Sequence, residues 1–595
     1  MLTQELIVEK LTTNCSQVLH KYLPTTRLPK IEFNRPTQVG CGDLTTNIAM
    51  LTYKMMAGQN PGKFKQPQAW AQELRQKLSA TCTGELKKTI ASWQVAGSGF
   101  INIFLTKKAQ LQLWQEAVSF TPPKQHPHPV IVEFSSPNIA KSFTVGHLRS
   151  TIIGAAIANL LQSQGYLVKR DNHLGDWGTQ FGKQVVAIQH WGNWQQIVKS
   201  SHPIADLVAL YVRFHQEAKE HPELEDEARL VFTKMEQGDK KYLSLWQKIV
   251  DISMKEFNQF YQEMGVSFDE NQGRGFGESF FRDKMQVVIA QLREKKLLQK
   301  SQGAWIITYP AATKLPPLMI FKQDGATLYA TRDLATDYYR LQTYGRYLTI
   351  VNEVGKEQSL YFKQIFALEA MLGWFTKEQR IHVAHGLYRF RDRKMSTRQG
   401  DVIWLGDIVS QAKNKVRLVC KKSLSDQDVN IIAWGAIKWN DLMREAKNDI
   451  DFDLDTMLSL KGNSGAYLQY TCVRLLAVLQ KAENKPFEAN QLKKLINRGK
   501  LADEISKFDE CQWGDDELTL IAKMNVYTEA VRVAAKRYAP HILANYLFEL
   551  ATVTNAYYAK QEILGHQQRI CLIKAITLFL VTGLTILGIQ IPSKM

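Results

Sequence analysis

The sequence predicts an α/β protein built on a parallel sheet, with a helical insertion in that sheet, an α+β domain before it and an all-α domain after it. Three observations predict this class. From Val130 to Asn172 the hydrophobic pattern runs strand, helix, strand, which is typical of parallel strands joined by a crossover helix. Between about residues 185 and 300 apolar residues recur at helical spacing, as at Leu207, Leu210 and Phe214. After about residue 410 helical spacing continues almost to the end.

The chain length sets the number of domains. A chain of 595 residues is expected to fold as about three or four domains. The proline-rich stretch 121–129 joins two patterned regions and predicts a linker. We therefore expect domains at residues 1–120, 121–410 and 411–595, with the helical insertion at about 185–300 inside the second.

The charge of the chain favours a polyanionic partner. The formal net charge is +18 and the pI is about 9.3, which creates a field that attracts nucleic acid. Nucleic acid is the first partner that this charge predicts. A soluble basic protein without such a partner is the plain alternative.

Cysteine usage and the termini indicate a cytoplasmic protein. The seven cysteines are scattered without any Cys-x-x-Cys pair, so neither a structural metal nor a disulfide framework is predicted. The N-terminus carries acidic residues and no arginine before Arg27, unlike a signal or transit peptide. The apolar run 575–590 is shorter than the ~20 residues that a span needs, so we expect a buried terminal helix and no membrane.

A predicted helix start after the first buried strand indicates a phosphate site. Val130, Ile131 and Val132 form the strand pattern, and one face of the following helix carries Ile153, Ala156, Ile157, Leu160 and Leu161. Gly146 and His147 therefore open that helix, where free N–H groups and the positive end of the macrodipole attract anions. Gly146 has no Cβ, and His147 and Lys141 add donors. The pattern predicts a nucleoside triphosphate.

These residues carry a family resemblance. Thr144-Val-Gly-His147 resembles the His-x-Gly-His signature of class I aminoacyl-tRNA synthetases, and the Ser-Ser-Pro-Asn-Ile-Ala-Lys frame at 135–141 is similar to arginyl-tRNA synthetases. Further matching motifs follow in order and reach almost the whole chain: 97–102, 175–182, 324–333, 394–398, 464–470 and 587–595. The resemblance implies a Rossmann-like catalytic domain between a domain that contacts the tRNA elbow and a helical anticodon-binding domain.

The resemblance also implies a reaction. An enzyme of this kind joins L-arginine to tRNA(Arg) through an arginyl-adenylate, with ATP and Mg²⁺. The substrate carboxylate is itself the nucleophile, so the site must position substrates and stabilise phosphate charge. The implied catalytic residues are His147 and Lys394, helped by Thr144 and Lys141, and the implied ATP contacts are Gly146, Gly175, Asp176, Met395 and Ser396. The plain alternatives are a capping histidine at 147 and a solvated basic loop around Lys394.

The family pattern is not met everywhere. Thr144 stands where the first histidine is usual, Ser142 replaces a proline, Arg393 replaces a glycine and Thr397 replaces a second lysine. Thr144 still offers a hydrogen-bond donor but no charge. These departures bear on the rate of the activation step more than on its identity, and Lys141 is a candidate for the charge missing at Thr397.

A pocket that selects arginine needs carboxylates to pair with the guanidinium group. Glu133 and Asp333 are the candidates, because each lies where the carboxyl edge of the sheet is expected. By resemblance, Asn138 holds the α-amino or carboxylate end of the substrate, Tyr329 flanks its side chain and Gln358 holds its amino group. A solvated strand-end carboxylate at Glu133 and a core aromatic at Tyr329 are the alternatives.

The C-terminal region carries an aromatic and cationic stripe. Tyr467, Tyr470 and Arg474 lie three and four residues apart, on one helix face, which suits stacking on unpaired bases. The same spacing is typical of a helix core. By resemblance these residues and the terminal Met595 contact the anticodon of tRNA(Arg). We expect the protein to be a monomer.

Two rival functions remain open. The first is a ligase for another amino acid, such as lysine or cysteine; the Glu133 and Asp333 carboxylates argue against cysteine, and the lack of a Cys/His set argues against a zinc-dependent pocket. The second is a catalytically silent tRNA-binding paralogue. His147 and Lys394 argue against it, whereas Thr144 and Thr397 keep it open.

Overall fold

The computed structural model describes residues 3–24, 26–36, 40–122, 126–321, 329–389, 404–420, 423–484 and 498–595. The chain forms two compact units. One comprises Met1–Thr121, Arg474–Ala530 and Glu549–Val581; the other comprises Pro122–Val473, Val531–Phe548 and Thr582–Met595. The last third of the chain thus contributes to both units. The division into domains at 1–120, 121–410 and 411–595 stays a prediction.

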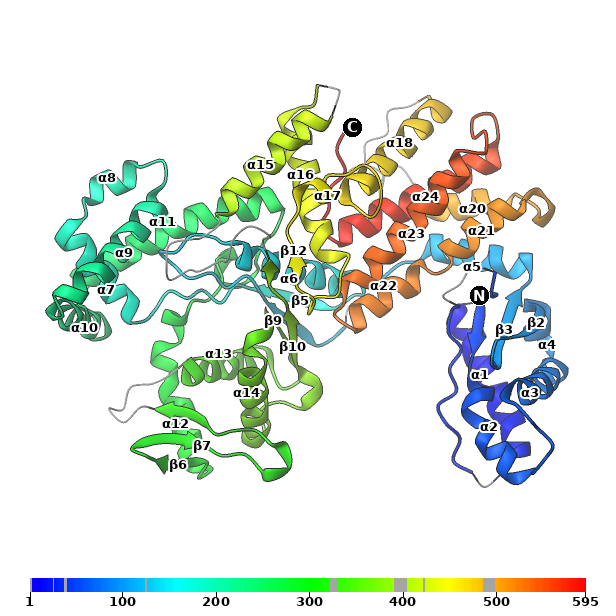
Figure 1. Cartoon of the computed structure of the whole chain (residues 1–595), viewed down its shortest axis with the longest axis horizontal. Helices are drawn as coiled ribbons and strands as arrows, with labels where there is room; N and C mark the ends of the chain where they lie inside the picture. Colours follow the sequence, from blue (N-terminus) through cyan, green and yellow to red (C-terminus); the bar gives the residue numbers. More distant parts are fainter. Residues whose placement is uncertain are drawn as a thin grey trace. The chain divides into compact units, whose positions relative to one another are not determined.

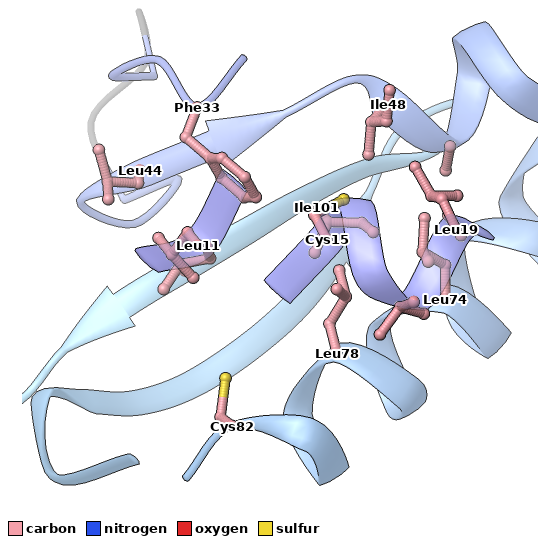
Figure 2. Packing of buried hydrophobic residues seen from close by; sticks show 14 of the residues in the cluster. Leu11, Cys15, Leu19, Phe33, Leu44, Ile48, Leu74, Leu78, Cys82 and Ile101 are labelled. Atoms are coloured by element: carbon pink, nitrogen blue, oxygen red, sulfur yellow. The ribbon is translucent and has the colours of Figure 1, made fainter. Parts of the chain in front are cut away.

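The N-terminal part of the first unit is α+β, as the sequence predicts. Its helices are α1 (Gln4–Tyr22), α2 (Ile48–Gln59), α3 (Pro67–Thr81), α4 (Gly84–Thr89) and α5 (Lys107–Ser119), and its strands are β1 (Leu44–Thr46), β2 (Ile90–Ala96) and β3 (Phe100–Leu105). The strands form an antiparallel sheet in the order β1-β3-β2. Figure 2 shows the core, where Leu11, Cys15 and Leu19 of α1 join Leu74 and Leu78 of α3 and Ile101 of β3 in one buried cluster.

The rest of the first unit is helical. Helices α20 (Arg498–Ser506) and α21 (Asp515–Met524) both pack against α5. The rings of Trp114 and Trp513 meet edge to face with centroids 5.3 Å apart, and both side chains are fully buried. Such a pair adds ~0.5–1.5 kcal/mol beyond the area it buries.

The second unit contains the predicted parallel sheet. Its strands are β4 (Pro129–Glu133), β5 (Leu167–Asp171), β9 (Thr349–Gly355) and β10 (Arg380–His385), in the order β10-β9-β4-β5 and all parallel. Helix α6 (Val145–Ser163) crosses from β4 to β5. Because β5 lies on one side of β4 and β9 on the other, the strand order reverses between β4 and β9. Open α/β sheets bind ligands at the carboxyl ends of strands at such a switch point.

The insertion between β5 and β9 is mostly helical over the predicted range 185–300, and a short sheet follows it. Helices α7 (Thr179–Trp191), α8 (Trp194–Lys199), α9 (Pro203–Glu220), α10 (Glu223–Glu236) and α11 (Lys240–Met264) lie together (Figure 1). After α12 (Met285–Glu294) comes an antiparallel sheet of β6 (Leu298–Ser301), β7 (Ala304–Ile307) and β8 (Leu318–Phe321), which the sequence pattern did not predict. Two helices, α13 (Tyr329–Tyr344) and α14 (Ser359–Leu372), flank β9 in the chain.

The region after residue 404 is almost entirely helical, as predicted. It contains α15 (Leu405–Val419), α16 (Asp426–Leu442), α17 (Leu454–Met457), α18 (Gly465–Glu483), α22 (Tyr527–Lys536), α23 (Pro540–Tyr558) and α24 (Gln567–Ile586). Its short strand β12 (Ile450–Asp451) pairs with β11 (Tyr388–Arg389), which precedes the region. Helix α24 is long and apolar enough to cross a membrane by length and composition, but Leu572, Phe579 and Leu584 are fully buried in the protein. A core helix of this kind passes the same test.

Candidate active site

The loop between β4 and α6 has an unusual backbone. Ser135, Ser136 and Ala140 have φ values of 72°, 46° and 59°, the left-handed region that side chains other than glycine rarely adopt. Three such residues within six positions store backbone strain, which proteins keep mainly at functional sites. Surrounding contacts must hold this loop in place.

Several elements supply those contacts. The Ser135 amide donates to the Ser150 hydroxyl of α6 at 2.9 Å, and the Ser136 amide donates to the Asn172 side chain at 3.1 Å. The Ala140 amide donates to the Ser253 hydroxyl at 3.1 Å. Tyr261 of α11 has its hydroxyl 2.8 Å from Ser135 Oγ. The helical insertion therefore braces the loop from outside the sheet.

The start of α6 is organised by Thr144 and His147. Thr144 is the N-cap residue, and its amide donates to His147 Nδ1 at 3.2 Å. A ring nitrogen that accepts from an amide carries no proton, so the neutral imidazole has its proton on Nε2. Burial and the nearby Lys141 charge lower the pKa of His147 to about 4. His147 is thus a capping residue, as the alternative to a catalytic role supposed, and it is also a neutral hydrogen-bond donor at the start of a helix.

The structure describes some of the other predicted catalytic and ATP-binding residues and not others. Gly146 and Lys141 are exposed beside His147, and an added Cβ on Gly146 would lie 3.5 Å from the Thr144 hydroxyl. Lys394, Met395 and Ser396 fall outside the described residues. Their predicted roles stay predictions.

The loop after β5 is held tightly. Gly175 forms an isolated parallel bridge with Asn138, and a Cβ at Gly175 would lie 2.4 Å from Asn138 Oδ1, so a larger residue would displace the Asn138 side chain. Asp176 accepts from the Ser279 amide at 2.8 Å and from its hydroxyl at 2.7 Å, and its carbonyl accepts from Trp246 at 2.7 Å. The carboxylate of Asp176 thus organises the chain around Ser279. Its predicted ATP contact, like that of Gly175, is a prediction.

A cavity of about 300 Å³ lies at the carboxyl ends of β4 and β9. This volume is at the lower end for small-ligand sites. All five predicted arginine-binding residues line it, together with further polar residues from β9, α13, α14, the loops after β4 and β5 and the 3-10 helix Glu278–Lys284: Glu133, Asn138, Tyr329, Asp333, Gln358, Ser136, His173, Glu278, Asp337, Arg340, Asn352 and Tyr361.

Glu133 already has protein partners. Arg340 Nη2 lies 2.5 Å from Glu133 Oε2, and the Asn352 amide donates to Glu133 Oε1 at 3.0 Å. Burial would raise the pKa of Glu133, but the Arg340 charge outweighs it and holds the pKa at about 2. Glu133 is therefore a buried carboxylate, not the solvated strand end of the plain alternative.

Arg340 belongs to a buried ion network that also contains Asp171, Asp337 and Arg380. Its guanidinium lies 2.5 Å from Asp171 Oδ2 and 3.0 Å from Asp337 Oδ1, and Arg380 Nη2 lies 2.5 Å from Asp337 Oδ2. Each buried charge is hydrogen-bonded to groups of opposite charge, and these contacts offset the free energy lost when the group leaves water. The network fixes the floor of the cavity.

Asp333 and Glu278 are two further carboxylates that line the cavity. Asp333 accepts from the Tyr361 hydroxyl, and its side chain is 33% exposed. Burial raises the pKa of Asp333 to about 6, although His173 and Tyr361 lower it. Glu278 pairs with Arg332 at 2.5 Å, and its burial raises its pKa. Sequence reasoning missed Glu278, because it lies outside the quoted motifs in a 3-10 helix, Glu278–Lys284.

Tyr329 and Gln358 lie at the exposed side of the cavity. Tyr329 is 64% exposed at the first residue of α13, so it is not a core aromatic. Gln358 is exposed at the N-cap of α14. Both side chains are thus accessible to a ligand.

The predicted anticodon residues lie on α18 and at the chain end. Tyr470 is 40% exposed, whereas the half-buried Tyr467 ring meets the Phe548 ring at 5.9 Å. The Arg474 guanidinium stacks over the Tyr558 ring at 3.9 Å. The tail before Met595 is anchored where Ser593 donates to Asp428 at 2.7 and 2.8 Å.

Within the described ranges, no group of three or more His, Cys, Asp or Glu side chains could hold a metal ion.

Three family models match the chain in order. Residues 9–105 match the arginyl tRNA synthetase N terminal domain, residues 110–454 match the catalytic domain of tRNA synthetases class I (R), and residues 468–595 match the DALR anticodon binding domain. The catalytic-domain match alone covers more than half of the chain.

Whole-chain relatives agree with these matches. A protein of Exiguobacterium sp. named arginine–tRNA ligase is 38% identical over 534 residues, covering 87% of this chain and 90% of the relative. A Streptococcus pneumoniae protein of the same name is 37% identical over 548 residues, covering 89% and 91%. Among solved structures, the arginyl-tRNA synthetases of Plasmodium falciparum (TM-score 0.78, 23% identity, 100% of both chains) and Thermus thermophilus (TM-score 0.77, 23% identity, 99% and 100%) share the fold.

Proposed function

The chain belongs to the arginyl-tRNA synthetase family, and we propose that the cavity at the ends of β4 and β9 holds the arginine substrate of that family's reaction. The protein is an arginine–tRNA ligase that charges tRNA(Arg) with L-arginine. This family membership removes both rivals that the sequence left open, a ligase for another amino acid and a silent paralogue.

Asp333 and Glu278, which line the cavity, are the proposed guanidinium ligands. Asp333 and Glu278 both have pKa values raised by burial, so a permanent cation placed between them would favour their charged forms. Glu133 is held by Arg340 and contributes negative potential from the floor. Tyr329 flanks the substrate side chain, and Asn138 and Gln358 hold its α-amino and carboxylate end.

The start of α6 is the proposed phosphate site. His147 presents Nε2–H beside the free amides of the first helical turn, with Thr144, Gly146 and Lys141 around it. These donors fit the negative oxygens of ATP. Lys394, Met395 and Ser396 complete the site by family resemblance, and Gly175 and Asp176 bound it on the side of the loop after β5.

The two sites together account for the first chemical step. The substrate carboxylate attacks the α-phosphorus of ATP, an arginyl-adenylate forms and pyrophosphate leaves. The residues of this chain position the carboxylate, donate to phosphate oxygens and require no general base. Mg²⁺ accompanies ATP and neutralises phosphate charge. A hydroxyl of the terminal ribose of tRNA(Arg) then takes the acyl group from the adenylate, and AMP leaves.

The proposed tRNA contacts divide between the ends of the chain. Residues 1–120 contact the tRNA elbow, and the helical region after 411 contacts the anticodon through Tyr467, Tyr470, Arg474 and Met595. The exposure of Tyr470 supports this assignment. We further propose a monomer that acts in the cytoplasm.

The single observation that carries the arginine site is a cavity at the sheet switch point whose buried carboxylates outnumber its guanidinium groups. Incubating the purified protein with each radiolabelled amino acid, ATP, Mg²⁺ and total tRNA tests it. We expect charging with arginine alone. Charging with another amino acid would overturn the pocket assignment, and no charging would overturn the enzyme.

A further inference from the structure

The arginine cavity holds more negative than positive charge. Among the described residues at and directly behind its wall there are six carboxylates and three guanidinium groups: Glu133, Asp171, Glu278, Asp333, Asp337 and Glu369, against Arg332, Arg340 and Arg380. Each guanidinium is in an ion pair with a carboxylate of this set. Uncompensated carboxylate charge in a buried site is unfavourable and draws in a cation or a proton.

His173 is placed to carry such a proton. It follows β5, lines the cavity and has Nε2 3.9 Å from Asp333 Oδ1. Both ring nitrogens are shielded from solvent, and neither has a hydrogen-bond partner among the residues that the structure describes. The Phe281 ring lies 5.8 Å from the imidazole and helps to bury it.

Charged groups face His173 from each neighbouring element. Glu133 of β4, Asp333 of α13 and Glu278 of the 3-10 helix favour the imidazolium, whereas Arg340 of α13 opposes it. Asp176, on the same loop as His173, adds a further carboxylate that His173 influences. Burial alone would lower the pKa of His173, but these carboxylates outweigh burial, so the pKa lies above its usual 6.5.

His173 keeps a proton more readily than Asp333 does. The same field of carboxylates acts on both groups, but an imidazole begins from a pKa of 6.5 and an aspartate from 3.8. The raised pKa of His173 and the Asp333 pKa of about 6 favour the proton on the imidazole rather than on the carboxylate.

We propose that His173 is a specificity-determining residue whose proton balances the charge of the cavity and is exchanged for the guanidinium of the arginine substrate. This inference rests on the proposed arginine site. When the guanidinium of arginine reaches Asp333 and Glu278, its permanent positive charge balances the carboxylates that the imidazolium balanced before. The proton leaves His173 for the buffer, and the neutral ring can then accept a hydrogen bond from the substrate.

The exchange separates arginine from its neutral analogue. Citrulline has nearly the same shape as arginine but carries an uncharged urea group. It therefore cannot balance the negative charge of the carboxylates once His173 has lost its proton. Citrulline therefore binds only to the protonated cavity, and its affinity does not rise with pH. Arginine affinity rises with pH by up to about tenfold per unit below the His173 pKa and then levels off.

Calorimetry of arginine binding to the full-length protein measures the exchanged proton. Titrations at about pH 6.5 in phosphate and in imidazole, whose ionisation enthalpies differ, give the number of protons released, which we expect to exceed half a proton per arginine because the pKa of His173 lies above 6.5. His173→Asn and His173→Gln should bind arginine with about half that release or less, the remainder coming from Asp333. An unchanged release in folded variants, or none in the unmodified protein, would overturn the proposal.

Histidine NMR tests the same exchange without a variant. The ¹³Cε1 resonance of His173 should titrate above pH 6.5 in the free protein and shift to the neutral form when arginine is added. His385 is a matched internal control, because it is also buried with a raised pKa beside Glu353 but does not line the cavity. A His173 titration that arginine leaves unchanged would overturn the proposal, whereas failure of arginine to bind at all would instead overturn the proposed arginine site.

Discussion

Arg340 Nη2 lies 2.5 Å from Glu133 Oε2, so a guanidinium group of the protein itself pairs with the first of the two carboxylates that the sequence assigns to the substrate. The second, Asp333, contacts the Tyr361 phenol and the His173 imidazole. The two candidate carboxylates therefore differ in kind: one is part of the buried floor and the other is a partly exposed residue that lines the cavity. Two predictions separate them.

Arg340→Met should destabilise the protein strongly. The change leaves Glu133, Asp171 and Asp337 without their common cation, and breaking one partner of a buried ion pair costs ~3–5 kcal/mol. Urea denaturation should show the loss as a lower midpoint. Arg346→Met, at an exposed arginine close by in the chain, is the control and should stay within ~0.5 kcal/mol of the unmodified protein. Equal effects of the two changes would contradict the ion network.

Asp333→Asn should weaken arginine binding and leave ATP binding nearly unchanged. Losing the charged partner of a desolvated guanidinium costs ~3–5 kcal/mol, which is at least a hundredfold in affinity. Tyr361→Phe removes only one hydrogen bond to Asp333 and should cost about 1 kcal/mol. Equilibrium binding of labelled arginine and of ATP gives both constants. Parallel losses for the two ligands would make Asp333 a structural residue.

His147→Ala should slow adenylate formation by ~10²–10³-fold, the usual effect of removing one preorganised donor at a charged transition state. Thr144→Val is the matched change, because it removes the capping hydroxyl and leaves the imidazole, which the Thr144 amide still orients. A missing cap costs ~1 kcal/mol of stability. Single-turnover formation of arginyl-adenylate in the presence of tRNA measures the step. If Thr144→Val is as slow as His147→Ala, His147 acts only through the cap.

The lowered pKa of His147 predicts a direction for stability against pH. The folded pKa is about 4, against 6.5 for an unperturbed imidazole. Between these values the unfolded chain binds a proton that the folded protein does not, so the free energy of unfolding falls as pH drops from 6.5 to 4. Denaturation midpoints of the unmodified protein should therefore drop more across this window than those of His147→Gln. Identical slopes would mean that His147 titrates normally in the folded protein.

The sequence predicted the elements whose residues interact locally. Val130 to Val132 and the apolar face of α6 read directly from periodicity, and both are buried in the structure. The strands β6, β7 and β8 escaped prediction because each has four residues, too few for a period to emerge beside polar neighbours. The strained backbone at Ser135, Ser136 and Ala140 was also unreadable, since no glycine marks it.

Residues of the candidate site could be predicted where local sequence marks them, but not where they depend on contacts between residues far apart in the chain. Asn138 and Asp333 lie in quoted motifs and Glu133 follows a strand pattern, and all three line the cavity. Arg340 acquires its partners 169 and 207 positions away in the chain. Such contacts follow from the tertiary fold, not from local sequence, and for the same reason the place of His173 among three carboxylates became visible only in the folded chain.

Tyr470 is the α18 residue best placed to read an unpaired base, because its ring is 40% exposed while Tyr467 is half-buried against Phe548. Stacking of one base contributes ~1–3 kcal/mol, so Tyr470→Ala should raise the KM for tRNA(Arg) by roughly five- to hundredfold, and Tyr470→Phe, which keeps the ring, should not. Tyr467→Ala should weaken tRNA binding as well but also lower the midpoint of unfolding, since it removes a packed ring. The charging of an acceptor-stem minihelix, which has no anticodon, should be unaffected by Tyr470→Ala. If intact tRNA and the minihelix lose affinity equally, Tyr470 does not contact the anticodon, and the helix face that carries it belongs to another contact.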